Sequence, residues 1–184
     1  MSTAGGSATG DEAMPAIGKV ATLEQLDSFA AQAVADGRRL VVGALITDDQ
    51  GRIYVQRRSE DRALFPGCWD IVGGHVESGE DLMTALGREV LEETGWRLAS
   101  CGPVVEILDW SASDGVARRE IDLLVKVTGD LSRPHLEPGK HSEGRWLAHD
   151  ELSVLLERRH EDDRWVHDTV ERAFRLLAEG RYGA

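Results

Sequence analysis

The spacing of apolar residues predicts helices near both ends of the chain. Thr22 and Gln25 fit a capping box at the start of an apolar series with helical spacing, which a glycine ends. We therefore expect a first helix over residues 22–36. Two more are expected toward the C-terminus, over residues 150–157 and about 162–178, the last with its apolar residues on one face.

Between these helices the pattern is typical of strands. The β-branched run LVVGALIT at residues 40–47 is separated from residues 52–57 by the polar turn DDQG, which predicts a hairpin. Strands and helices alternate without a strict βαβ rhythm, so we predict an α/β fold with a mixed sheet and helices on both faces. Further strands are expected around residues 69–72, 104–108, 120–127 and 145–147.

The length and composition of the chain favour one globular domain. Its 184 residues are 41% hydrophobic, enough to bury a sizeable core. We predict a single domain over residues 18–180, with its core over about 40–156. Residues 1–17 are rich in Gly, Ser, Ala and Thr, which cannot bury apolar surface, and we expect them to form a flexible tail.

The charge and cysteine content exclude several classes of function. A formal net charge of −12 argues against a nucleic-acid-coating or membrane-surface role, because both need basic patches. Cys68 and Cys101 form no CxxC pair, so neither a disulfide framework nor a zinc site is indicated. The sequence has no long apolar run and no signal-peptide pattern at its start, so we expect a cytoplasmic protein.

A further helix, expected over residues 80–94, carries three carboxylates in little more than one turn: Glu89, Glu92 and Glu93. Like charges at this spacing repel each other. At about 100° per residue, Glu89 and Glu93 fall within about 20° of Leu82 on the apolar stripe, and Glu92 lies about 80° from it. A solvated acidic face would require all three opposite the stripe.

Carboxylates beside a buried face need cations to compensate them. Arg88 is four residues from Glu92 and neutralises only part of this charge. A hard divalent ion, Mg²⁺ or Mn²⁺, is the natural remaining partner, and a phosphate group is its expected co-ligand. The preceding Gly73-Gly74 lacks side chains and would allow a close approach to the backbone.

The same stretch resembles the box of the Nudix hydrolase family, G-x5-E-x7-R-E-U-x-E-E-x-G-U with U apolar. Gly74, Glu80 and the run REVLEETGW from Arg88 to Trp96 match every fixed position. Flanking segments also look like the family, so the resemblance covers roughly residues 40–156. It implies an α/β/α sandwich and the metal-dependent hydrolysis of a diphosphate linkage in a nucleoside diphosphate derivative.

The resemblance also implies roles for individual residues. Glu89, Glu92 and Glu93 would be metal ligands, with the carbonyl of Gly73 and the later Glu143 as further candidates. Arg88 would orient the glutamates and Glu80 would support the loop. Either Glu89 or Glu92 would take the proton of the attacking water, and the sequence leaves this choice open.

Substrate-binding residues are harder to assign because they lie outside the box. Gly74 and the loop histidine His75 are candidates for phosphate contacts, and Arg57 and Arg58 end a strand near the expected cleft. Trp69 and Trp110 could stack on a base, although strand tryptophans more often pack in the core. The sequence lacks features common in ADP-ribose and dinucleoside polyphosphate branches, so we expect a nucleoside triphosphate or modified nucleotide.

Two alternatives from other classes remain open. The lead-in to the box is similar to isopentenyl-diphosphate isomerases, but these need a cysteine just before the loop histidine, and Cys68 lies too early. Non-catalytic Nudix-like sensors usually lose box glutamates, which are all present here. We expect a small-molecule partner rather than nucleic acid or membrane, and the resemblance also allows a homodimer.

Overall fold

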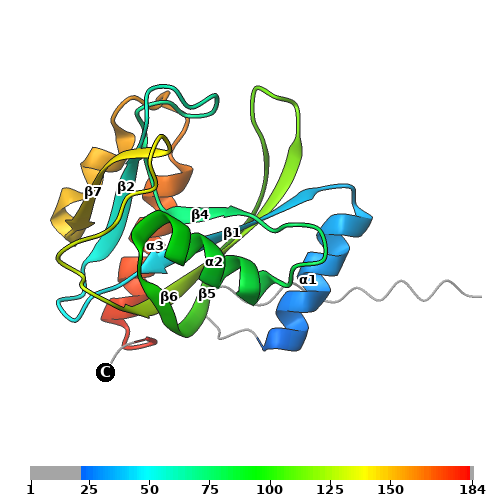
Figure 1. Cartoon of the computed structure of the whole chain (residues 1–184), viewed down its shortest axis with the longest axis horizontal. Helices are drawn as coiled ribbons and strands as arrows, with labels where there is room; N and C mark the ends of the chain where they lie inside the picture. The colour runs from blue at the N-terminus through cyan, green and yellow to red at the C-terminus, as the bar shows by residue number, and fades with distance from the viewer. Residues whose placement is uncertain (1–21, 183–184) are drawn as a thin grey trace, which may run out of the picture.

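The structure, a computed structural model, describes residues 22–182, and the tail predicted over residues 1–17 lies outside them. Helices lie on both sides of a central layer of strands (Figure 1). In chain order the elements are α1 (Leu23–Ala35), β1 (Arg39–Ile46), β2 (Ile53–Arg58), β3 (Trp69–Asp70), β4 (Val72–His75), α2 (Leu82–Thr94), β5 (Arg97–Ser111), β6 (Ala117–Thr128), β7 (His141–Leu147), the 3-10 helix η1 (His149–Leu156) and α3 (Trp165–Ala178).

The strands form two sheets. One has the order β4-β1-β6-β5, in which β1 and β6 are parallel and the other neighbours are antiparallel. The second has the order β3-β2-β7 and is antiparallel. This combination of parallel and antiparallel pairs with flanking helices confirms the predicted α/β fold with a mixed sheet.

The hairpin predicted between residues 40–47 and 52–57 is wrong. β1 and β2 belong to different sheets, and among the described residues they share one isolated bridge, Thr47 to Ile53. β1 is buried from Leu40 to Ile46 because both of its faces are covered by hydrophobic clusters, and β4 and β6 occupy both of its edges. A strand with two neighbours has no free edge for a third. After the polar turn the chain therefore enters the second sheet as β2.

Alternate residues of β1 point into two separate hydrophobic clusters. Leu40 and Val42 pack with residues of α1 and α2, whereas Leu45 packs with η1 and α3. This follows from the two-residue period of a strand, which sends neighbouring side chains to opposite faces. The central sheet therefore separates the α1–α2 layer from the α3 layer.

β5 and β6 are longer than expected and form a hairpin that rises beyond the central sheet (Figure 1). Register shifts interrupt their pairing between Leu98 and Glu106. Such bulges bend a strand and increase its twist. The far end of the hairpin, where Ser111 pairs with Ala117, forms one side of the site described below.

The helices follow their local sequence signals closely. The Thr22 hydroxyl accepts a hydrogen bond from the Gln25 N–H at 3.2 Å, and the Gln25 side chain accepts one from the Thr22 N–H at 3.0 Å, which completes the capping box. The helix expected over residues 150–157 is η1, a 3-10 helix. Within residues 22–182 no helix combines the length and the apolar character needed to cross a bilayer.

Candidate active site

Helix α2 carries the three glutamates, and local residues set both of its ends. The Asp81 side chain caps the first turn by accepting a hydrogen bond from the Thr84 N–H at 2.9 Å. Gly95 ends the helix with a φ of 73°, and its N–H donates to the Leu91 carbonyl at 2.9 Å. This left-handed conformation favours glycine because it has no Cβ.

The three carboxylates are buried to different degrees, in the order that their helical angles predict. Glu89 and Glu93 are 5% and 4% exposed. The side chain of Glu92 is 45% exposed. All three line one cavity, with Glu89 and Glu93 on its inner wall and Glu92 toward solvent.

Glu93 is held by donors from two other segments. It accepts hydrogen bonds from the Gly73 N–H at 3.1 Å and from the Gln56 side-chain amide. Burial, with a further contribution from the charge of Glu89, raises the pKa of Glu93 to about 8. His141 lies 3.9 Å away, but burial and neighbouring cations lower its pKa to about 3, so it stays neutral.

Arg88 connects the loop to the helix. Its Nε and Nη2 each donate to Glu80 at 2.9 Å, a bidentate pair. Nη1 donates to Glu89 at 2.7 Å and to Glu92 at 3.4 Å, and Nη2 also donates to the His75 carbonyl at 3.0 Å. The hydrogen bond from Arg88 lowers the pKa of Glu80. One guanidinium thus fixes the loop against two glutamates that face the cavity.

The two glycines before the box helix lie in strand β4 rather than in a loop, and close packing requires both of them. A Cβ on Gly74 would lie 2.5 Å from the Cδ atom of Glu89. A Cβ on Gly73 would lie 3.0 Å from the Cα of Gly43 on the neighbouring strand β1 and would collide with the carbonyl of Val42. Any side chain at Gly74 would therefore displace the carboxylate that Arg88 holds in place.

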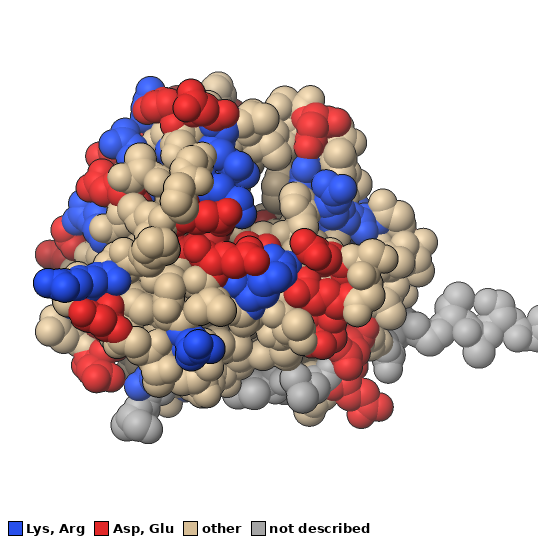
Figure 2. All heavy atoms as spheres, in the orientation of Figure 1, with Lys and Arg blue, Asp and Glu red and all other residues tan. Residues whose placement is uncertain are grey.

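The glutamates face a cavity of about 310 Å³, which is the lower end of the size range for small-molecule sites. In Figure 2 it appears as a hollow between two raised parts of the molecule, with basic side chains on one rim and acidic ones at its base. Such an arrangement suits an anionic ligand that approaches the carboxylates with a cation between them. The basic residues that line the cavity are Arg58, Arg62, Arg88, Arg118 and Lys140.

The structure brings some of the predicted substrate residues to the cavity and leaves others outside. Arg58, Gly74 and His75 line it. Arg57 does not, because neighbouring residues of a strand face opposite ways, and its Nε donates to a loop carbonyl at 3.0 Å. Glu143, expected as an additional metal ligand, is also absent from the lining; its side chain is 55% exposed, 4.0 Å from Arg57.

Comparison with known proteins agrees with this geometry. Residues 37–169, more than half of the chain, match the model of the NUDIX domain. The chain belongs to the Nudix family. The match includes the whole of the predicted box and the strands that surround the cavity.

Individual Nudix relatives are similar over different lengths. Nucleoside triphosphatase NudI of Escherichia coli O139:H28 is 40% identical over 79 residues, which is 43% of this chain and 52% of the relative. The chain thus spans about half the length of the curated relatives it matches. The MutT NUDIX hydrolase from Burkholderia pseudomallei is 27% identical with a TM-score of 0.55, covering 72% of this chain and 98% of that structure. The MutT protein from Methanosarcina mazei Go1 has a TM-score of 0.60 at 24% identity, covering 79% and 96% respectively, and supports the fold.

The Nudix family generally uses a divalent metal, and the residues of this cavity fit one. Two nearly buried carboxylates, Glu89 and Glu93, lie beside each other, and burial raises the pKa of both. A cation would compensate this charge, and carboxylate and carbonyl oxygens are the ligands that hard divalent ions prefer. Glu89, Glu92, Glu93 and the Gly73 carbonyl could supply them.

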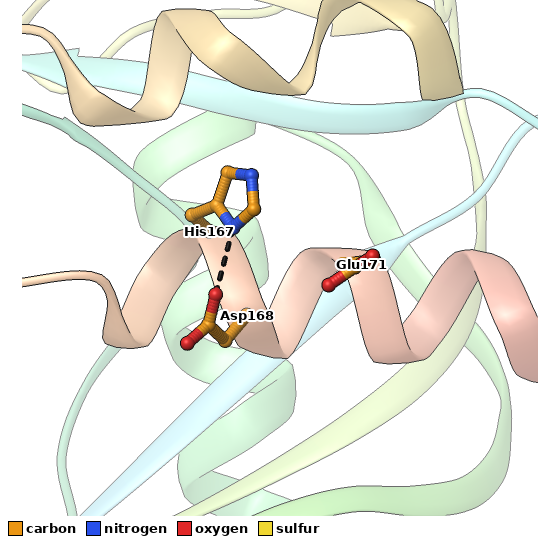
Figure 3. A group of neighbouring side chains, drawn as sticks. All are labelled: His167, Asp168 and Glu171. Atoms are coloured by element: carbon orange, nitrogen blue, oxygen red, sulfur yellow. Dashed lines mark hydrogen bonds and ion pairs between the residues drawn. The ribbon is translucent and has the colours of Figure 1, made fainter.

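A second group with ligand-like spacing lies on the surface of α3. His167, Asp168 and Glu171 gather within 4.8 Å of one another (Figure 3). The Nδ1 of His167 is 2.8 Å from Asp168, and the guanidinium of Arg164 lies 3.1 Å from the same nitrogen. Because this arginine already supplies positive charge to the partly exposed group, nothing there calls for a metal ion.

Several residues of the Nudix site could not be assigned from the box. Gln56 lies on β2 of the second sheet, 37 residues before Glu93 in the sequence, and it contacts Glu93 because the fold brings this strand against α2. Trp69 packs in the core, as expected for a strand tryptophan, whereas Trp110 lines the cavity. Glu120 also lines it, and its alternation with Asp122 in the otherwise apolar segment from Glu120 to Val125 was the available signal that two acids share one buried face.

Proposed function

We propose that this protein hydrolyses a diphosphate linkage in a nucleoside diphosphate derivative with the help of Mg²⁺ or Mn²⁺. A nucleoside triphosphate or a modified nucleotide is the proposed substrate. The observation that carries the proposal is the set of three box glutamates on one wall of a cavity whose rim is basic. The nucleoside triphosphatase activity named for the NudI relatives supports the same substrate class.

The proposed mechanism divides the work among the residues of α2 and the preceding loop. A bound divalent ion would neutralise pyrophosphate oxygens and lower the pKa of a coordinated water. Glu93, fixed by the Gly73 N–H, and Glu92 would hold the ion. Burial raises the pKa of Glu89, although Arg88 opposes this, and a raised pKa makes the carboxylate a stronger base for the proton of the attacking water. Glu92 is the second candidate for this role.

The cationic rim would bind the phosphate chain. Arg58 lies 3.3 Å from Asp70 and donates to the Leu64 carbonyl at 3.0 Å, so it is already oriented at the cavity wall. Lys140 lies at the start of β7, paired with Glu137 at 2.7 Å. Both can contact phosphate oxygens while remaining anchored, which lowers the entropy cost of binding. Gly74 and His75 would lie beneath the phosphates.

The test is a panel of nucleoside triphosphates, nucleotide sugars and dinucleotides, assayed for release of phosphate or pyrophosphate with Mg²⁺ or Mn²⁺. Glu92→Gln and Glu93→Gln should lower turnover by at least about 100-fold with the fold retained, because each removes a ligand charge. Glu171→Gln on α3 is the matched control, and it should keep wild-type activity and metal dependence.

Other outcomes would contradict the proposal. No turnover of any compound with either metal would favour the sensor alternative, and metal-dependent isomerisation of isopentenyl diphosphate would favour the isomerase alternative. A cytoplasmic location and a homodimer are also part of the proposal. Cell fractionation and light scattering of the purified protein test them directly.

A further inference from the structure

The cavity has a second acidic wall that the Nudix box does not supply. Glu120 on β6 and Asp70 on β3 both line it and are nearly buried. In the central sheet, β1 separates β6 from β4, and Val41 pairs with Glu120 on one side and with His75 on the other. Two strand spacings place the backbone of Glu120 roughly 10 Å from that of His75 on β4. The second wall is therefore built by a different part of the chain from the glutamates of α2.

Behind Glu120 lies a second buried carboxyl group. Asp122 is fully buried, and its side chain shares a hydrogen bond with the carboxyl group of Glu120. The Asp122 side chain packs against Gly43, and a Cβ at Gly43 would collide with the Asp122 carboxyl group. Burial, and then the charge of Glu120, raises the pKa of Asp122 well above its usual value. Burial raises the pKa of Glu120 as well, to about 8, and the hydrogen bond between the two carboxyl groups favours the proton on Asp122.

Glu120 itself is only partly satisfied. Its Oε2 accepts a hydrogen bond from the Trp110 indole at 2.7 Å. A buried carboxylate can accept several hydrogen bonds, and acceptor capacity left unused in a cavity favours a ligand with N–H groups. The described side chains around Glu120 provide this hydrogen bond, a second one from Asp122, and the nearby carboxyl group of Asp70.

Aromatic rings flank the same wall. Trp110 lies nearly parallel to Trp165, with ring centroids 6.2 Å apart, and Phe65 lies 6.2 Å from Trp110. All three rings line the cavity. Arg118 is held 4.7 Å from the Trp110 ring and fixes its position. Phe65 has a φ of 51°, an unfavourable value for an aromatic residue, and such strain is concentrated at ligand sites.

We propose that Glu120 recognises the amino group of the substrate's nucleobase, while Trp110 and its neighbouring rings contact the face of the base. The inference rests on the proposed function, because the phosphate chain must lie at α2 for the base to reach β6. It assigns the substrate class as nucleotides whose base carries an exocyclic amino group. Cytosine and guanine are preferred over uracil and hypoxanthine.

The discrimination follows from hydrogen-bond polarity. A hydrogen bond donated by a ligand N–H favours the ionised form of Glu120, which only accepts hydrogen bonds, so the site attracts the amino group of cytosine or guanine. In uracil a carbonyl oxygen takes the place of the cytosine amino group and would face the carboxylate as a second acceptor. Sites built to bind an N–H group discriminate strongly against analogues that lack it, because their own polar group is then left unpaired.

Two matched substrate pairs test the inference. CTP and UTP differ at this amino group, and so do GTP and ITP. The wild-type protein should show kcat/KM values at least about 10-fold higher for CTP than for UTP, and for GTP than for ITP. Glu120→Gln should bring both ratios to within about threefold of one, because an amide can donate as well as accept.

Glu106→Gln is the matched control. Glu106 lies on the neighbouring strand β5, opposite Asp122 of β6, and its side chain pairs with Arg172 and does not line the cavity. It should leave both substrate ratios unchanged. Equal rates for the members of each pair in the wild-type protein would overturn the inference without requiring any variant to fold. Preserved ratios in Glu120→Gln would overturn it as well.

A second cation site at Glu120 is the competing explanation. In that case Glu120→Gln would lower all four rates equally and raise the metal concentration needed for half-maximal activity, which would also overturn the inference. Failure of the proposed function looks different, because no nucleotide would then be hydrolysed with either metal. Hydrolysis without preference for amino-bearing bases refutes only the assignment of Glu120.

Discussion

Replacing Glu93 by glutamine is expected to change how the stability of the metal-free protein depends on pH. Burial, and then the charge of Glu89, raises the pKa of Glu93 from 4.5 to about 8. The unfolded chain releases this proton near pH 4.5, whereas the folded chain keeps it until about pH 8. The stability that this group contributes is thus present in full below about pH 4.5 and is lost as the pH rises to about 8.

The size of the effect follows from the two pKa values. They differ by about 3.5 pH units, and each unit corresponds to about 1.36 kcal/mol. The free energy of unfolding of the wild-type protein should therefore fall by on the order of 4 kcal/mol between acidic pH and about pH 7.5 because of this one residue. Glu93→Gln has no proton to release, so the variant lacks this contribution.

Urea unfolding in the presence of a chelator, followed by tryptophan fluorescence between about pH 5 and pH 7.5, measures the effect. The difference between wild type and Glu93→Gln cancels the other titrating groups. Glu92→Gln is the matched control on the same helix, and it should keep the wild-type slope because the Glu92 side chain is 45% exposed. Parallel pH profiles for wild type and Glu93→Gln would refute the reasoning.

Three further changes have clear expected outcomes. Gly74→Ala should lower kcat by at least about 10-fold in steady-state kinetics, because the added methyl group displaces the carboxylate of Glu89. Gly87→Ala is its control, because a Cβ there meets open space: kcat should stay unchanged, and thermal unfolding should show a gain in stability of roughly 0.5–1 kcal/mol. Arg88→Lys should lower kcat about 10- to 100-fold, because an ammonium cannot form the bidentate pair with Glu80, and unchanged kinetics would contradict this. Gly95→Ala should destabilise the fold by about 1 kcal/mol through its φ of 73°, measured by urea unfolding, and equal stability would exclude the strain.

The sequence predicts the parts of this protein that depend on nearby residues. The carboxylates of α2 are buried or exposed as their helical angles indicate, because Leu82 anchors the inward face of the same helix. Arg88 contacts Glu80 and Glu89 as the contiguous box implies. These contacts span one loop and one helix, so sequence spacing already contains their geometry.

Contacts between segments that are distant in the sequence cannot be predicted from sequence spacing. The turn after β1 looked like a hairpin because the sequence does not reveal that both edges of β1 are already paired, one of them with residues near Glu120. Gln56 and Glu143 show the same limit at the site. Both lie in strands of the second sheet, but only Gln56 faces α2, and the packing of the two sheets decides which one does.

The long β5–β6 hairpin has a consequence for the order of folding. Its strands are joined by residues 112–116, so the chain entropy lost in closing it is small. The parallel pairing of β1 with β6 instead joins residues about 80 positions apart, such as Val41 and Glu120, and such contacts form slowly. We therefore expect the hairpin to form early and the cavity late, so that ligand binding reports the last step of folding rather than collapse of the chain.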